Sequence, residues 1–129
     1  MSDYLPDLRQ GDEYTLCIDM SNDGVNPVDL TGYKAWFTLK ADLSDGDSQA
    51  ALQFSCVAGS EENDKPEQGL MYMVIPSSIM RNVMPGIYLY DLQIKRPGAV
   101  GEGIKTLLPP WDNPLDMIQV LGQVTQAVA

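Results

Sequence analysis

The feature that most constrains the fold is a strand-turn-strand pattern between Asp12 and Lys40. In its first half apolar residues alternate with polar ones, the period of two that is typical of a strand with one buried face. The connection NPVDLTGY (Asn26–Tyr33) contains Pro27, which cannot continue the hydrogen bonds of a sheet. The alternation then resumes up to Lys40. We therefore predict two strands, with Leu30 and Tyr33 of the connection placed in the core.

The second of these strands carries a tryptophan on its polar face. Trp36 alternates with the apolar positions and shares its face with Lys34, Thr38 and Lys40. Two interpretations stay open. Trp36 lies beside the lysine side chains or under a loop, or it is an exposed contact for a partner subunit.

The rest of the chain continues as short strands separated by turn residues. Further strands are expected at about Ala50–Val57, Leu70–Pro76 with both faces covered, Gly86–Lys95, Ile104–Leu108 and about Met117–Gln123. Ser77 to Pro85 is expected to form one helical turn at most, capped by Ser77 or Ser78. About seven strands without crossover helices predict an all-β fold, an antiparallel sandwich or barrel.

A chain of 129 residues and 14.2 kDa suits one domain. We expect residues 1–10 to be a lead-in, either frayed or used as an arm against a neighbour, and residues 11–129 to be a single domain. No segment approaches the ~20 apolar residues of a membrane span. The first residues are acidic and polar rather than signal-like, so the protein is expected to stay where it is synthesised.

The composition excludes several kinds of chemistry. The chain has no histidine, which removes Ser-His-Asp and Cys-His mechanisms and imidazole metal sites. The net charge of −10 should repel nucleic acids and anionic membranes, and its simplest role is solubility. No phosphate-binding glycine loop is present. We expect no enzyme, no cofactor and no small-molecule substrate.

Two acidic segments and two cysteines were considered as candidate metal or redox sites. Positions one, three, five and six of an EF-hand calcium loop are matched by Asp19, Ser21, Asp23 and Gly24, but the ninth and twelfth positions are Pro27 and Leu30, so the site is incomplete. A looser cluster contains Asp42, Asp45 and Asp47. Turn chemistry explains both segments, and no metal is expected. Cys17 and Cys56 are expected to be small buried residues, with a disulfide between them as the alternative.

The order of the motifs resembles a family. QGD (Gln10–Asp12), NPVDLTGY, GIYLYDL (Gly86–Leu92) and VLGQVT (Val120–Thr125) are arranged as in small structural proteins of tailed bacteriophages and prophages. The resemblance covers about residues 9–125 and implies an immunoglobulin-like β-sandwich. It also implies that Tyr88 or Tyr90 forms a tyrosine-corner hydrogen bond, the alternative being two tyrosines at the edge of the core. The segment LLPPWDNPLDM (Leu107–Met117) departs from the family as an insertion before the last strand.

The function that this resemblance implies is a non-enzymatic virion component, assembled in the host cytoplasm and associated with the tail, baseplate or fibre attachment. Its expected partners are further copies of itself and other virion proteins, with no nucleic acid and no membrane. The alternatives are a capsid decoration or head-tail joining protein, and a module that binds carbohydrate or a host receptor. The candidate contact residues are apolar groups of the lead-in, the polar strand face and the insertion, namely Leu5, Leu8, Trp36, Trp111, Leu115 and Met117.

Overall fold

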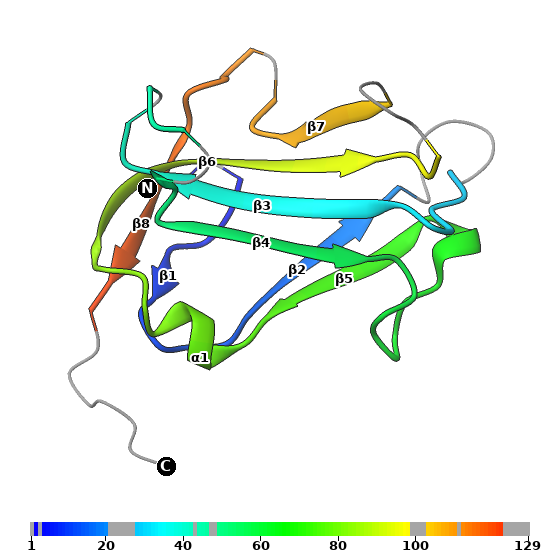
Figure 1. Ribbon diagram of the computed structural model, residues 1–129, viewed down its shortest axis with the longest axis horizontal. Coiled ribbons are helices and arrows are strands. Elements are labelled where there is room, and N and C mark those ends of the chain that lie inside the picture. Colours follow the sequence, from blue (N-terminus) through cyan, green and yellow to red (C-terminus); the bar gives the residue numbers. More distant parts are fainter. Residues whose placement is uncertain are drawn as a thin grey trace.

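Two β-sheets enclose one apolar core (Figure 1). The computed structural model describes residues 2, 4–20, 28–42, 44–46, 49–98, 103–110 and 112–122. Its strands are β1 (Leu8–Arg9), β2 (Tyr14–Asp19), β3 (Lys34–Lys40), β4 (Leu52–Val57), β5 (Leu70–Ile75), β6 (Gly86–Lys95), β7 (Ile104–Leu108) and β8 (Met117–Leu121). The larger sheet has the order β1-β8-β6-β3-β4, with β7 also paired to β6, and the smaller sheet is β2-β5. The prediction of a mostly β protein is confirmed.

The alternation in the sequence becomes the division between core and surface. On β3 and β6 every second side chain points to the smaller sheet. Alternate side chains of β2 and β5 in that sheet pack against them. The buried apolar residues of these four strands are Leu16, Ile18, Ala35, Phe37, Leu39, Met71, Met73, Ile75, Tyr88, Tyr90, Leu92 and Ile94. The faces predicted for β2, β3 and β6 are therefore confirmed.

The DLTGY part of the connection between β2 and β3 is a tight turn, which is stabilised by side-chain hydrogen bonds and by a glycine. The carboxylate Oδ1 of Asp29 accepts hydrogen bonds from the backbone N–H of Thr31 at 2.9 Å and from its hydroxyl at 2.6 Å. Gly32 has a φ of 80°, which disfavours any residue with a Cβ. The turn buries Leu30 completely, as the sequence predicted, whereas Tyr33 is only partly buried against the core.

Three predictions about the middle of the chain were wrong. The 70–76 run does not have both faces covered, because β5 belongs to a two-stranded sheet and fully buried side chains alternate along it with partly buried ones. The helix α1 (Ser77–Met80) begins after Pro76 and has no side-chain cap, so neither Ser77 nor Ser78 caps it. A second short turn, the 3-10 helix Pro66–Gln68, exceeds the single helical turn that we predicted.

The lead-in packs against its own chain rather than fraying. Strand β1 pairs in parallel with β8, with Leu8 opposite Val120, and only 2% of Leu8 is exposed. This pair also departs from the purely antiparallel arrangement that we predicted. Because two residues are too few to show an alternation, no sequence pattern indicates a strand here.

Strands β7 and β8 share one edge of β6. Ile104 pairs with Lys95 near the end of β6, whereas Met117 pairs with Leu89 nearer its start. Between them residues 109–110 and 112–116 lie outside the strands, in an excursion that begins with a cis Leu108–Pro109 peptide bond. The segment that we predicted as an insertion therefore connects β7 to β8, two strands that pair with different parts of β6. None of the helices that the structure describes is long and apolar enough to cross a membrane.

Both cysteines are free thiols. The prediction of burial was wrong for Cys17, which is exposed because it lies on the side of β2 that faces away from the core. Cys56 is partly buried beside β5, with its Sγ 3.9 Å from the carbonyl oxygen of Tyr72. Burial, followed by the nearby carboxylates of Asp64 and Glu61, raises the pKa of Cys56 to about 11. The disulfide alternative is not formed in this structure.

Candidate binding groove on the larger sheet

The main concave surface lies on the outer face of the larger sheet. One cavity of about 350 Å³ extends beneath the excursion, and a second of about 470 Å³ continues towards β4. They share Thr38, Lys40 and Asp91, so together they form one groove. We call it the outer-face groove, lined by Trp36, Thr38, Lys40, Gln53, Leu89, Tyr90, Asp91, Gln93, Ile104, Thr106, Pro109, Pro114 and Leu115.

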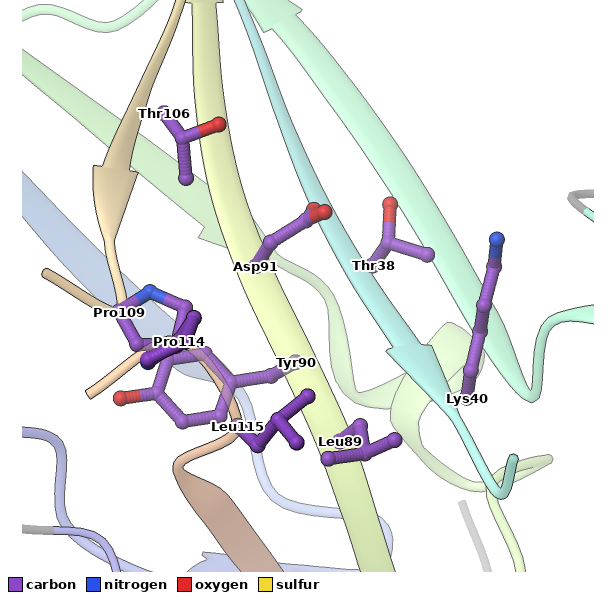
Figure 2. Close-up of a pocket in the computed structure, with 9 residues that line it drawn as sticks. All are labelled: Thr38, Lys40, Leu89, Tyr90, Asp91, Thr106, Pro109, Pro114 and Leu115. Carbon is purple, nitrogen blue, oxygen red and sulfur yellow. The ribbon is translucent and has the colours of Figure 1, made fainter. Parts of the chain in front are cut away.

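The floor of the groove consists of polar side chains from adjacent strands. Thr38 of β3 lies opposite Gln53 of β4 and opposite Asp91 of β6. The Gln53 amide donates to the Thr38 hydroxyl at 3.4 Å, and the Gln93 amide donates to the Thr106 hydroxyl at 3.2 Å. Figure 2 shows Thr106, Asp91, Thr38 and Lys40 arranged side by side across β7, β6 and β3. The groove therefore presents hydroxyl, amide, carboxylate and ammonium groups over a short distance.

One wall of the groove is apolar and comes from the excursion. Pro109, Pro114 and Leu115 lie beside the ring of Tyr90 and next to Leu89 (Figure 2). Three prolines, Pro109, Pro110 and Pro114, restrict the backbone of the excursion, since each fixes its own φ angle. The wall is thereby stiffened before any ligand arrives.

A buried hydrogen-bond network holds the excursion against the sheet. The hydroxyl of Tyr90 donates to Oδ2 of Asp116 at 2.7 Å, and the hydroxyl of Ser2 donates to the same oxygen at 2.6 Å. The Ser2 oxygen also accepts the backbone N–H groups of Tyr4 and Leu5. Burial is the main cause that raises the pKa of Tyr90, and the bond to Asp116 adds to it. The network joins the lead-in, β6 and the base of the excursion.

Basic residues gather at the other end of the same sheet. Lys34 of β3 lies directly opposite Lys95 of β6, Arg96 comes directly after β6, and Lys105 lies on β7 opposite Ile94. The ammonium of Lys34 lies 5.0 Å from the centroid of the Trp36 ring, a cation–π contact. The half-buried Trp36 thus lies beside a lysine, as the first of the two sequence interpretations proposed.

The structure brings only part of the predicted contact set together. Trp36 and Leu115 both line the groove, and Met117 lies opposite Leu89 on the same face. Leu5 is half-buried and Leu8 is buried within the chain, so the side chain of Leu8 is not presented to a partner. Trp111 lies outside the described residues.

Sequence reasoning missed the polar floor of the groove. Gln53, Asp91, Gln93 and Thr106 were treated as ordinary solvent-facing positions of strands. A signal was present, because polar residues on alternate positions of neighbouring strands must share one face. What the sequence lacked was the strand order that makes β3 and β6 neighbours.

The acidic segments do not form a metal centre among the residues that the structure describes. Of the partial calcium loop only Asp19 is described, and residues 21–27 lie outside the described residues. Asp42 accepts the N–H and hydroxyl of Ser44, and Asp45 accepts the N–H of Asp42, which is turn chemistry. Asp47 is outside the described part. No group of three or more metal-ligating side chains was found in that part.

Comparison with known proteins yielded no relative. No family model, no curated protein and no solved structure matches the chain.

Proposed function

We propose that the two-sheet arrangement is an immunoglobulin-like sandwich. Supporting this, the hydroxyl of Tyr88 donates to the backbone oxygen of Met84 at 2.6 Å, four residues upstream. Tyr88 lies near the start of β6, at the corner where the chain arrives from β5 and α1. This is the geometry of a tyrosine corner, in which a tyrosine at a strand start bonds back to the preceding connection. Of the two tyrosines considered from the sequence, Tyr88 has this geometry, and Tyr90 bonds to Asp116 instead.

We propose further that the protein is a non-enzymatic structural component of a tailed-phage virion, of the tail, baseplate or fibre attachment. It acts through assembly with further copies and with other virion proteins, and is assembled in the host cytoplasm. The order of motifs from Gln10 to Thr125 supports the phage context. The observation that carries an assembly role is an apolar patch beside the excursion, formed by the exposed Ile87, Leu115 and Met117 and the half-buried Leu89.

This apolar patch is contiguous on one face of the sheet. Met117 lies opposite Leu89, and Ile87 is two residues earlier on the same face of β6. The exposed fractions are 47% for Ile87, 56% for Leu115 and 42% for Met117. Apolar residues including methionine are enriched at the centre of protein interfaces, where charged residues are depleted. In a chain of net charge −10, an uncharged exposed patch is a suitable centre for a protein contact.

Sedimentation velocity over a range of concentrations tests this proposal. We expect the wild-type protein to associate and Met117→Glu to remain monomeric, because a buried unpaired carboxylate opposes the contact. Val57→Glu is the matched control, since Val57 is 47% exposed on β4 at a distant edge of the sheet. If the wild type stays monomeric and captures no virion protein from assembled particles, the assembly role is wrong. Deleting residues 1–9 is a poor test, because it removes Leu8 from the core.

The alternative within the structural class is a capsid decoration or head-tail joining protein. Antibody labelling or mass spectrometry of separated tail and capsid fractions distinguishes these locations. Recovery in tail fractions supports the first proposal, and recovery in capsids alone supports the alternative.

A further inference from the structure

The starting observation is a like-charge pair on the outer face of the larger sheet. Lys34 and Lys95 are directly opposite each other in the register of β3 and β6. Together with Arg96 and Lys105 they place four of the eight basic residues of an acidic chain at one end of this sheet. Residues opposite each other on one face have Cβ atoms about 4.5–5.5 Å apart, and like charges there are destabilising.

The neighbours that the described strands place around this pair do not relieve the repulsion. On the outer face the register surrounds the two lysines with Val57, Trp36 and Ile104, and Gln93 precedes Lys95 on its strand. None of these neighbours carries a negative charge. An anionic group of a ligand placed between the two ammonium groups would convert the repulsion into two favourable contacts.

The second observation is the aromatic ring next to this pair. Trp36 is half-buried and lines the outer-face groove, and the Lys34 ammonium sits on its ring at 5.0 Å. Indole rings attract partly positive C–H groups because the ring face is electron-rich. A ring-shaped ligand that stacks on Trp36 would bring its own substituents within reach of Lys34.

The third observation is that polar side chains form the floor of the groove beyond Trp36. It offers the amides of Gln53 and Gln93, the hydroxyls of Thr38 and Thr106, and the carboxylate of Asp91. Amides and hydroxyls both donate and accept, whereas a carboxylate only accepts. The outer-facing positions from Leu89 to Gln93 extend over about 13 Å at the usual rise of a strand. This floor suits a hydroxyl-rich, extended ligand.

We propose that the outer-face groove binds a carboxylated oligosaccharide, of the uronic acid type. One sugar ring stacks on Trp36 with its carboxylate between Lys34 and Lys95. The hydroxyl groups of the following sugars donate to Asp91 and exchange hydrogen bonds with the threonines and glutamines. The proposal does not depend on the virion role, although Leu89 and Leu115 belong both to the groove lining and to the apolar patch.

Two competing ligands fit the groove less well. A nucleic acid needs a row of cations along its phosphates, whereas this groove has Asp91 in its floor and the chain is acidic overall. A peptide strand would lie on the face of a sheet rather than at its edge, so its backbone groups would find few partners. A sugar carries its polar groups on its periphery and matches the side chains present.

Isothermal titration calorimetry with the full-length protein tests the proposal. The probes are trigalacturonic acid, the neutral trisaccharide maltotriose and a single-stranded oligonucleotide. We expect trigalacturonic acid to bind at least about tenfold more tightly than maltotriose, because charged hydrogen bonds are stronger than neutral ones. The affinity should fall as salt is added.

Variants assign the binding to the groove. Trp36→Ala should weaken trigalacturonic acid binding about tenfold or more, and Lys34→Gln with Lys95→Gln should remove the preference for the acidic sugar. The charge-matched control is the double variant Lys65→Gln with Arg81→Gln. Both residues are exposed and lie outside the groove, so this variant should change neither the affinity for trigalacturonic acid nor the preference for the acidic sugar. Circular dichroism checks that each variant is folded.

Three outcomes would overturn the proposal. The first is no binding of either sugar at millimolar concentration, and the second is equal binding of acidic and neutral sugars. The third is tighter binding of the oligonucleotide, which would identify a general anion site. Trp36 lies outside the apolar patch, so Trp36→Ala should associate as the wild type does in sedimentation velocity, and failure of the assembly proposal is distinguishable from failure of this one.

Discussion

The two faces of β3 and β6 differ more than any other pair of regions in the molecule. The inner face holds Phe37 and Leu39 with no exposed surface, and Tyr90 and Leu92 pack beside them. The outer face of the same strands is a groove of mixed polar and charged groups around Trp36. Each strand thus contributes to the core through one set of residues and offers a surface through the other. Substitutions on the inner face should therefore lower stability, whereas substitutions on the outer face should mainly change ligand binding.

The largest expected difference is between neighbouring aromatic residues of β3. Phe37→Ala should lower the free energy of unfolding by about 3–5 kcal/mol, because it leaves a cavity in the core. Trp36→Ala should cost about 1 kcal/mol, since the ring is half-buried and loses mainly its contact with Lys34. Urea denaturation followed by circular dichroism measures both. Equal losses would contradict the division between the two faces.

The next effect concerns the link between the core and the excursion. Asp116→Ala should lower the free energy of unfolding by about 1–3 kcal/mol, because the buried hydroxyls of Tyr90 and Ser2 lose their acceptor. Asp112→Ala, at an exposed position of the same excursion, is the control and should have little effect. Denaturation midpoints report both. An unchanged midpoint in Asp116→Ala would mean that the network does not hold the excursion.

A smaller effect of opposite sign is expected at Tyr14 of β2. Its ring lies 6.0 Å from that of Phe37, and its buried hydroxyl has no hydrogen-bond partner among the described residues. Tyr14→Phe should therefore stabilise the protein by about 1 kcal/mol. Chemical denaturation near neutral pH tests this, with Tyr72→Phe as the control on the outer face of the small sheet. A loss of stability would show that the hydroxyl has a partner in solution.

The same residue predicts a pH dependence. Burial raises the pKa of Tyr14 to about 12, from an ordinary value near 10. As pH rises from 10 to 12, the unfolded chain releases this proton before the folded chain does, so stability falls over that interval. Tyr14→Phe should lose less stability than the wild type in alkaline denaturation. Identical alkaline profiles would contradict the assignment.

The smallest effect is expected on the outer face. Lys95→Glu replaces a like-charge pair with an opposite-charge pair across β3 and β6, and should stabilise the protein by about 0.2–1 kcal/mol. The gain should shrink at high salt, because the pair is solvent-accessible. Thermal melting at low and high salt measures it. A destabilised Lys95→Glu would indicate that Lys95 has a favourable contact that the register does not reveal.

Much of the fold could be predicted from alternation alone. The period of two identified the strands and their inner faces, since a one-residue shift would expose every apolar side chain. Leu8 could not be placed, because a two-residue strand has no period and its partner lies at the other end of the chain. The prediction that both faces of residues 70–76 are covered was wrong, because an apolar run does not reveal how many strands its sheet contains.

Only some residues of the groove could be predicted from the sequence. Trp36 and Leu115 were singled out by residue type, since exposed aromatic and apolar groups are informative by themselves. Asp91, Gln93 and Gln53 became informative only when the strand order placed them beside Trp36. Lys34 and Lys95 are 61 positions apart in the sequence, and only the pairing of β3 with β6 makes them neighbours.

The parallel pairing of β1 with β8 affects how the chain reaches its folded state. Ser2 and Asp116, which the same closure brings together, are 114 positions apart in the sequence. During synthesis, the start of the chain must wait for β8 to leave the ribosome before it can pair. Contacts between distant residues slow folding, because a long loop must close before they form. The closure of this sheet should therefore be a late event, and Leu8→Ala should accelerate unfolding far more than it slows folding.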